Sequence, residues 1–252
     1  MYTEKEIVEL TEEEQELTEE ELLVLLAALN ATLQDLEKEL RNFYQEFGKD
    51  GVVTYSEVKK WVSDKKHVTR LLFLNQTISD VFERGFDVFE DSFATHLRAI
   101  VKKECKFFNV DIDIDEVLNT LWGVDESNWL QRLNAHRSKW NIVINNDLKL
   151  SFLKRDSIGN VLTQTIERGE SMETILKRLW RTESSAISSI ARKNIFEKLG
   201  IKKYQFIHVD GCVCERCSDM HNRIFPIAEY IVGVTANPLH PNCNDITVPI
   251  TE

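Results

Sequence analysis

All four prolines of this 252-residue chain lie within its last 27 residues, and the preceding 225 residues contain none. Proline lacks a backbone N–H and its ring clashes with the previous helical turn, so it interrupts helices. A long stretch without proline can therefore form long uninterrupted helices. The sequence predicts a mainly α protein with long N-terminal helices, followed by a small α+β module near the C-terminus where the prolines begin.

An apolar repeat with heptad spacing follows the first helix-start signal. The segment Thr18-Glu-Glu-Glu21 has the spacing of a capping box, in which the first and last side chains cap each other's backbone amides. After it, apolar residues recur at alternating steps of four and three: Leu22, Leu26, Leu29, Leu33, Leu36, Leu40, Phe43 and Phe47. This pattern predicts a helix that packs against a helical partner, and Gly48 is expected to end it.

A second capping box, Thr54-Tyr-Ser-Glu57, predicts a long helical stretch that reaches about Lys106. Its apolar residues recur at steps of three and four: Leu71, Leu74, Ile78, Phe82, Phe86, Phe89, Phe93, Leu97 and Ile100. A stripe of this kind is typical of a helix core. We expect an antiparallel helix pair or a small bundle in which this stripe faces the leucine repeat.

Shorter helices and a small sheet are expected in the second half of the chain. Helices are predicted over residues 144–168, 172–179 and 183–199, with Gly169 and Gly200 as stops and Ser171 as an N-cap. The stretches 204–209 and 246–250 are rich in residues that favour strands. We therefore expect a small sheet in the tail.

Negative charge is concentrated at the N-terminus. Residues 1–50 contain 15 acidic and four basic residues, whereas the remaining 202 residues contain 27 of each. Because phosphate binding requires Lys and Arg, the first segment is not expected to bind DNA. It suits a solvated arm or a contact with a basic protein surface.

We predict an acidic flexible arm over residues 1–17, an N-terminal helical domain over 18–115 and a C-terminal domain over 116–252. The longest apolar run, Leu22 to Leu29, is too short to span a bilayer, so no membrane contact is expected.

Two pairs of metal-ligating residue types occur in the tail. Cys214 and Cys217 are separated by two residues, and 22 residues later His240 and Cys243 have the same spacing. A turn of this length lets both side chains of a pair reach one ion, and two pairs complete a tetrahedron. The pattern predicts a structural zinc ion that stabilises a tail, residues 204–250, too small for a core of its own.

Other roles for the cysteines stay open at this stage. Cys212 lies two residues before Cys214 and is either a substitute ligand or a bystander. The four cysteines near the tail's turns could instead be unliganded thiols or form disulfides in an oxidising compartment. The acidic N-terminus has no apolar signal segment, which favours thiolates. Cys105 lies in an apolar helical stretch and is expected in the core.

Asp111, Asp113 and Asp115 alternate with isoleucines. They are either an exposed face leading into a helix or, less favoured, a cation site.

The segment from about Trp122 to Ile250 resembles the Mu F-like minor head protein family of tailed bacteriophages, also called phage head morphogenesis proteins. The resemblance rests on an ordered series of short segments: Trp129 to Arg132, Arg168-Gly-Glu-Ser171, Arg181-Thr-Glu183, Tyr204 to Asp210 leading into Cys214 and Cys217, and Pro238-Leu-His-Pro-Asn-Cys243. Each segment is short, and their order and spacing together make the pattern specific.

This resemblance implies a structural protein of the virion head interior that is made in the host cytoplasm and contacts the portal protein and inner capsid proteins. It implies a part in head morphogenesis, with genome packaging or delivery and weak binding of phage DNA as open additions. The chain departs from the family in two places. Asn244-Asp245 stands where the family usually continues with Arg-Cys, which removes a basic residue and one candidate ligand. Asn222 stands near a position where glycine is common, and we expect it to take a left-handed turn conformation.

Two other classes of function compete with a structural role. An enzyme, such as a metal-dependent nuclease or a toxin-type transferase, would draw on the polar residues Arg181, Glu183, His208, His221 and His240. Four ligands close a zinc shell, however, and residues two apart do not share a helix face, so we expect no catalytic residues and no enzymatic activity. A nucleic-acid-binding module would draw on local basic clusters, but the neutral charge of residues 51–252 predicts weak, salt-dependent binding.

Overall fold

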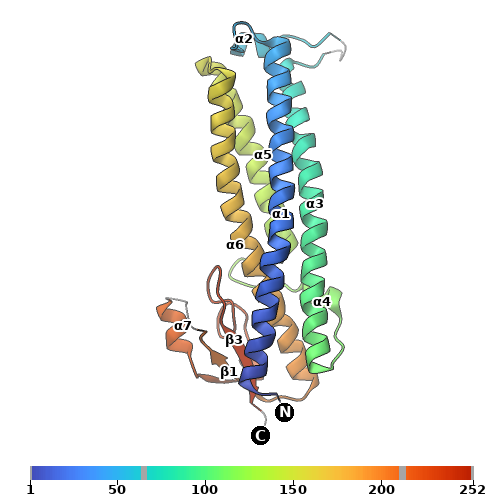
Figure 1. Ribbon diagram of the computed structural model, residues 1–252, viewed down its shortest axis with the longest axis vertical. Coiled ribbons are helices and arrows are strands. Elements are labelled where there is room, and N and C mark those ends of the chain that lie inside the picture. The colour runs from blue at the N-terminus through green and yellow to red at the C-terminus, as the bar shows by residue number, and fades with distance from the viewer. Residues whose placement is uncertain (1, 64–66, 210–213, 251–252) are drawn as a thin grey trace. The chain divides into compact units, whose positions relative to one another are not determined.

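Long helices dominate the fold of the protein. The computed structural model describes residues 2–63, 67–209 and 214–250. Four long helices and two short ones come first along the described chain: α1 (Glu4–Phe47), α2 (Tyr55–Val58), α3 (Arg70–Phe108), α4 (Ile114–Asn119), α5 (Trp129–Lys154) and α6 (Ile158–Lys198). Figure 1 shows the small C-terminal elements that follow them: β1 (Lys203–Ile207), α7 (Glu215–Met220), β2 (Ile224–Pro226), a 3-10 turn (Ile227–Glu229) and β3 (Ile246–Ile250). The predicted mainly α class with a small C-terminal sheet is confirmed.

The sheet has three antiparallel strands in the order β2-β1-β3. Tyr204 of the central strand pairs with Phe225 of β2 and with Pro249 of β3. Tyr204 and Phe206 point to the same face and are fully buried, as the alternation of side chains along a strand requires. Both strands predicted from the sequence, 204–209 and 246–250, are confirmed within a few residues.

The chain forms two compact units, and neither unit is continuous in sequence. The terminal unit contains the described residues of 1–23, 92–132 and 176–252, and the central unit contains those of 24–91 and 133–175. Four helices contribute residues to both units: α1, α3 and α6, each about 40 residues long, and α5, whose first turn, 129–132, belongs to the terminal unit. These units therefore differ in their boundaries from the consecutive segments 18–115 and 116–252 expected from the sequence.

Helical segments from α1, α3, α5 and α6 build the central unit. The leucine repeat is largely buried, as predicted, at Leu29, Leu36, Leu40 and Phe43. One step differs, because Leu25 is buried and Leu26 of the repeat is only half-buried. The aromatic stripe of α3 is buried as well, and Phe86 packs against Trp140 of α5 with ring centroids 5.4 Å apart. Burial of both patterns confirms that they are core faces of helices, and the aromatic contact shows that α3 packs against α5 in this unit.

Two glycines in the central unit allow helices to approach closely. A Cβ atom at Gly85 of α3 would lie 2.3 Å from the Thr32 hydroxyl of α1. A Cβ atom at Gly169 would lie 2.6 Å from a methyl group of Leu33. Gly169 was expected to end a helix, and this prediction is wrong: it lies inside α6, where its missing side chain makes room for α1. Ser171 likewise lies inside α6 and caps no helix.

Replacing Gly85 with alanine should destabilise the protein. The new methyl group would overlap the stiff, branched side chain of Thr32, and overpacking costs about 1–3 kcal/mol, only partly offset by the ~1 kcal/mol gain in helix propensity. We expect a net loss of about 1 kcal/mol or more in the free energy of unfolding, measured by urea titration. Gly159→Ala is the matched control, because its nearest neighbour would be 3.7 Å away, and it should be neutral or stabilising. Equal effects of the two changes would contradict this packing argument.

The helix boundaries differ from the sequence prediction in three places. Helix α1 begins at Glu4, where Thr3 and Glu6 form the capping box that was assigned to Thr18. Residues 4–17 are therefore helical, with Ile7 and Leu10 buried, and are not a flexible arm. The cap at Thr54 is confirmed, but it begins only the four-residue α2. The third difference is a break at residues 155–157 that separates α5 from α6, with Arg155 at φ 62°.

Other predicted boundaries agree with the structure. Helix α1 ends at Phe47 just before Gly48, and α6 ends at Lys198 just before Gly200, which has φ 71°. Asn222 has φ 63°, as expected for a residue that takes a glycine-like turn conformation. Asp113 accepts a hydrogen bond from the Glu116 amide as the N-cap of α4, so the alternating aspartates do lead into a helix.

A buried ion pair joins α1, α3 and α6 in the terminal unit. Arg192 of α6 donates from Nε to Glu104 of α3 over 2.6 Å and from a terminal nitrogen to the Thr11 hydroxyl of α1 over 2.7 Å. Glu14 of α1 lies 3.6 Å from the same guanidinium, and the Ser188 hydroxyl lies 2.9 Å from Glu14 and 2.7 Å from Glu104. Two carboxylates share one cation, and burial together with the nearby Glu104 raises the pKa of Glu14 well above its ordinary value. Glu14 therefore holds a proton more readily than an exposed glutamate.

His96 lies in the same unit between α1 and α6. Its ring stacks on Trp180 and its Nε2 lies 2.9 Å from the Ser184 hydroxyl, while its buried Nδ1 has no hydrogen-bond partner among the described residues. Burial lowers the pKa of His96 to about 4, because the imidazolium would lose its hydration.

His96 should make the protein less stable as the pH falls. The folded pKa of about 4 lies below the unfolded value of about 6.5, so the unfolded state binds the proton first. The contribution is fully present above pH 6.5, and about 3 kcal/mol should be lost by pH 4. We expect the free energy of unfolding to fall more steeply over this window in the wild-type protein than in His96→Gln, as measured by urea titration at several pH values. Parallel curves would contradict the assignment.

Candidate metal centre

Short turns place each predicted ligand pair. Cys214 precedes α7 and Cys217 lies in its first turn, where the Ser218 amide donates to the Cys214 carbonyl over 2.9 Å. The second pair has a similar turn, because the Cys243 amide donates to the His240 carbonyl over 3.2 Å. In both pairs a separation of three residues brings the two side chains to the same side of a turn. This is the geometry that the spacing in the sequence predicts.

The donor atoms of the two pairs meet around Cys217. The donor atoms of Cys214, Cys217 and His240 all lie within 4.8 Å of one another, and so do those of Cys217, Cys243 and Asp245. The sulfurs of Cys217 and Cys243 are 3.9 Å apart. The four predicted ligands are therefore brought together, and these five residues form a candidate metal-binding site, which we call the donor cluster. Cys212 lies outside the described residues.

Asp245 is the member of the donor cluster that the sequence analysis missed. It lies two residues after Cys243, at the place where the resembling family usually has a second cysteine. The sequence suggested that a candidate ligand is lost there. The structure corrects this: a carboxylate stands in place of a thiolate and lies among the donor atoms. An acidic residue at that spacing was the available signal, since carboxylates also bind metal ions.

Hydrogen bonds hold the Asp245 carboxylate in place. It accepts from His208 Nδ1 over 2.7 Å, from the Val209 amide over 3.1 Å and from the Cys243 thiol over 3.2 Å. Burial alone would raise the pKa of Asp245, but the hydrogen bonds outweigh it and hold the pKa below its ordinary value. His208 is itself connected to His221, whose Nδ1 accepts from the His208 amide. Both histidines thus support the site and were not recognised from the sequence as part of it.

The tautomer of His240 suits a metal ligand. Its Nδ1 lies 2.8 Å from the carbonyl oxygen of Pro241. A carbonyl only accepts, so Nδ1 carries the hydrogen and the lone pair is on Nε2. Metal-binding histidines commonly have one ring nitrogen fixed in this way by a backbone carbonyl.

An apolar environment surrounds the thiols. Cys217 and Cys243 are buried with Phe206 and Leu239, and Cys214 packs at the edge of this cluster. Burial, and then the neighbouring Asp245, raise the pKa of Cys243 to about 12, and burial likewise raises the pKa of Cys217. Without a cation these thiols keep their protons. A metal ion would bind by displacing the protons, which makes its affinity dependent on pH.

Arg216 fixes the two halves of the site against each other. It lies between the cysteines of the first pair and donates to the Leu239 carbonyl over 3.2 Å and to the Gly233 carbonyl over 3.0 Å. These bonds join α7 to the loop that carries His240 and Cys243. The side chain therefore supports the donor cluster without being a donor.

Arg181 and Glu183, two of the polar residues considered for catalysis, are engaged in ion pairs. Arg181 forms a two-pronged pair with Glu19 of α1, at 2.6 and 2.7 Å. Glu183 is buried and accepts from Arg132 over 2.8 Å and from the Trp122 indole over 3.0 Å. The two side chains lie in different pairs, as their spacing on a helix requires. Among the described residues, only the two overlapping triads of the donor cluster have metal-site spacing, and Asp111, Asp113 and Asp115 are not among them.

No family model matches this chain, and no curated protein or solved structure is significantly similar to it. Within the described part of the chain, no helix has the length and apolar character needed to cross a membrane.

Replacing Cys217 with serine should abolish metal binding. Cys217 belongs to both triads, so its loss leaves two donors in each. With zinc as the added ion, we expect the bound metal to fall from about one per chain to near zero, measured by elemental analysis after gel filtration. Amide exchange should become faster over residues 203–250 and stay unchanged in the central unit.

Cys105→Ser is the matched control for this variant. Cys105 is a partly buried thiol on α3 that is not among the donors, so this variant should bind the metal normally. Wild-type metal content in Cys217→Ser would show that the donor cluster is not a metal site.

Proposed function

We propose that the protein is a structural minor head protein of a tailed bacteriophage, with a zinc ion that stabilises its C-terminal module. The observation that carries this proposal is the ordered series of short segments that resembles the Mu F-like family. Several of these segments are far apart in the sequence and contact one another in the terminal unit, as expected if they belong to one folded module.

The contacts among these segments are specific. Arg132 of the first segment pairs with Glu183 of the Arg181-Thr-Glu183 segment over 2.8 Å. The backbone amide of Asn242, in the last segment, donates to the Thr182 hydroxyl over 3.2 Å. Thr182 lies between Arg181 and Glu183. The last segment also meets the Cys214–Cys217 pair at the donor cluster. One segment does not join them: Arg168 pairs with Asp147 within the central unit.

Zinc is the ion that best fits the donors. A zinc–sulfur bond of about 2.3 Å and a tetrahedral angle place two sulfurs ~3.8 Å apart, close to the 3.9 Å between Cys217 and Cys243. Three thiols and one imidazole supply the four ligands Cys214, Cys217, His240 and Cys243. Thiolate-rich shells of this kind are usually structural, because no position is left for water or substrate. The zinc would hold α7 against the loop that precedes β3.

The surface charge suits a protein partner better than DNA. The first turns of α1 expose a row of glutamates to solvent: Glu9, Glu12, Glu13, Glu16 and Glu20. Such a surface repels phosphate and attracts a basic protein surface. We propose that the partners are the portal protein and inner capsid proteins, that the location is the virion head interior after assembly in the host cytoplasm, and that any contact with DNA is weak.

Quantitative mass spectrometry of purified, DNA-filled particles tests this role. A minor head protein should be present at a low, fixed ratio to the portal protein. Empty particles and a lysate fraction of the same density serve as controls for copurification. Absence of the chain from mature particles, or a ratio that varies between preparations, would overturn the assignment.

A further inference from the structure

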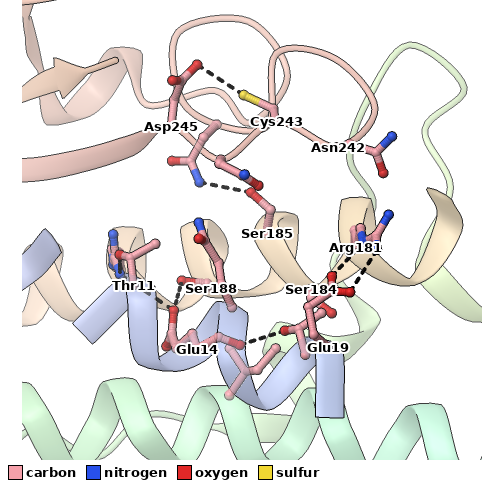
Figure 2. Close-up of a pocket in the computed structure, with 16 residues that line it drawn as sticks. Thr11, Glu14, Glu19, Arg181, Ser184, Ser185, Ser188, Asn242, Cys243 and Asp245 are labelled. Carbon is pink, nitrogen blue, oxygen red and sulfur yellow. Dashed lines mark hydrogen bonds and ion pairs between the residues drawn. The ribbon is translucent and has the colours of Figure 1, made fainter. Parts of the chain in front are cut away.

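A polar cavity lies beside the donor cluster, within the terminal unit. Its volume is about 320 Å³, and its walls come from α1, α6 and the segment 237–245. Figure 2 shows Asn242, Cys243 and Asp245 on a loop that faces Ser185 and Ser188 of α6, with α1 below them. The volume lies at the lower end of the range for ligand pockets, about 300–1,000 Å³, so a ligand would be small.

One loop takes part in both the donor cluster and this cavity. Cys243 and Asp245 belong to the donor cluster and also line the cavity, and Asn242 and Asn244 alternate with them along the loop. A metal ion bound at the donor cluster would therefore fix one wall of the cavity.

The lining disfavours an anionic or apolar ligand. Both arginines of the lining are already bound by carboxylates, Arg181 by Glu19 and Arg192 by Glu104. Ile100 is the single aliphatic side chain in the described lining, and no aromatic ring is present there on which a flat molecule could stack. A planar ligand would therefore find no ring to stack on, and an aliphatic ligand would meet only one aliphatic side chain.

The lining disfavours a cation as well. Glu19 is neutralised by Arg181, and Asp245 is held by His208 and the Val209 amide. Burial raises the pKa of the third acid, Glu14, so that it tends to stay protonated. The Asp245 carboxylate keeps its charge, but its oxygens already accept from His208 Nδ1, the Val209 amide and the Cys243 thiol, which leaves little capacity for a further cation.

Among the described residues, carboxamides supply the polar side chains of the lining that have no partner, because the lining hydroxyls are already hydrogen-bonded: Thr11, Thr18, Ser184, Ser185 and Ser188. Gln15 of α1 and Asn242 and Asn244 of the loop make no side-chain hydrogen bond to another described residue. Each carboxamide offers both donors and acceptors. A ligand must replace the hydrogen bonds that it and the walls make with water, so it must itself carry donors and acceptors in several directions. Hydroxyl groups on adjacent carbons meet this requirement.

We propose that this cavity binds a small, neutral, polyhydroxylated molecule of monosaccharide size, held between α1, α6 and the loop 242–245. The carboxamides of Gln15, Asn242 and Asn244 are among the more exposed groups of the lining and form its entrance, whereas Ser184 and Ser188 of α6 are buried and form its inner wall. This inference does not depend on the proposed role in a phage head.

Ligand-observed NMR on the full-length, zinc-loaded protein tests the proposal, with glucose, myo-inositol and glycerol as probes and acetate, ammonium and phenol as comparisons. We expect saturable binding for at least one of the polyhydroxylated probes and none for the comparisons. Binding of acetate, ammonium or phenol in place of these probes would overturn the ligand class. Absence of any saturable binding would show that the cavity holds water only.

Two variants locate the binding. Gln15→Ala and Asn244→Ala remove entrance carboxamides from two different elements, and neither side chain has a partner whose loss would unfold the protein. Each should weaken binding about tenfold, since a lost hydrogen bond of about 1.4 kcal/mol corresponds to that factor. Gln45→Ala, an exposed glutamine of α1 outside the cavity, should bind as the wild type does. Wild-type binding by both entrance variants would place the ligand elsewhere and overturn the assignment.

Discussion

The buried guanidinium of Arg192 sets the arrangement of the terminal unit. Its side chain is 1% exposed, and a charge at that depth costs several kcal/mol unless carboxylates surround it. Glu104 of α3 supplies the carboxylate, and Thr11 and Glu14 of α1 supply further oxygen atoms beside the guanidinium. Because short charged hydrogen bonds tolerate little displacement, the rotation of all three helices is fixed at this level. The same rotation of α6 directs Ser185 and Ser188 towards the cavity and sets Glu183 against Arg132.

A second constraint comes from the loop that precedes β3. Sequence spacing alone predicted its two ligands, His240 and Cys243. These residues are three positions apart in one turn, and the geometry of such a turn hardly depends on the rest of the fold. Asp245 could not be identified in this way. Its carboxylate is held by His208 and the Val209 amide, which follow β1, and strand pairing of β1 with β3 brings them together. That contact depends on the sheet, so it becomes visible only in three dimensions.

The helices show the same division between local and long-range information. The apolar repeats of α1 and α3 could be predicted from the sequence, because the buried face of each helix requires an apolar residue about every 3.6 positions, independently of the other helices. The start of α1 was misplaced because the sequence around Thr18 has capping spacing, yet Ile7 and Leu10 continue the buried face upstream and make helix favourable there. Gly169 was misjudged because a glycine that ends a helix and a glycine that admits a neighbouring helix are alike in sequence. Only the position of Leu33 distinguishes them.

The discontinuity of the two units has a consequence for biosynthesis. All residues of the central unit precede residue 176, so its core can assemble while the remainder of the chain is still being translated. The terminal unit must wait, because the Thr18 carbonyl accepts from the Trp180 indole across a separation of 162 residues. During that interval the start of α1 has only the α3 part of its unit to contact, where the Tyr2 hydroxyl donates to the Phe108 carbonyl. At ordinary elongation rates of about 5–20 residues per second the wait is roughly 10 to 30 seconds, long enough for chaperones to bind the newly made N-terminus.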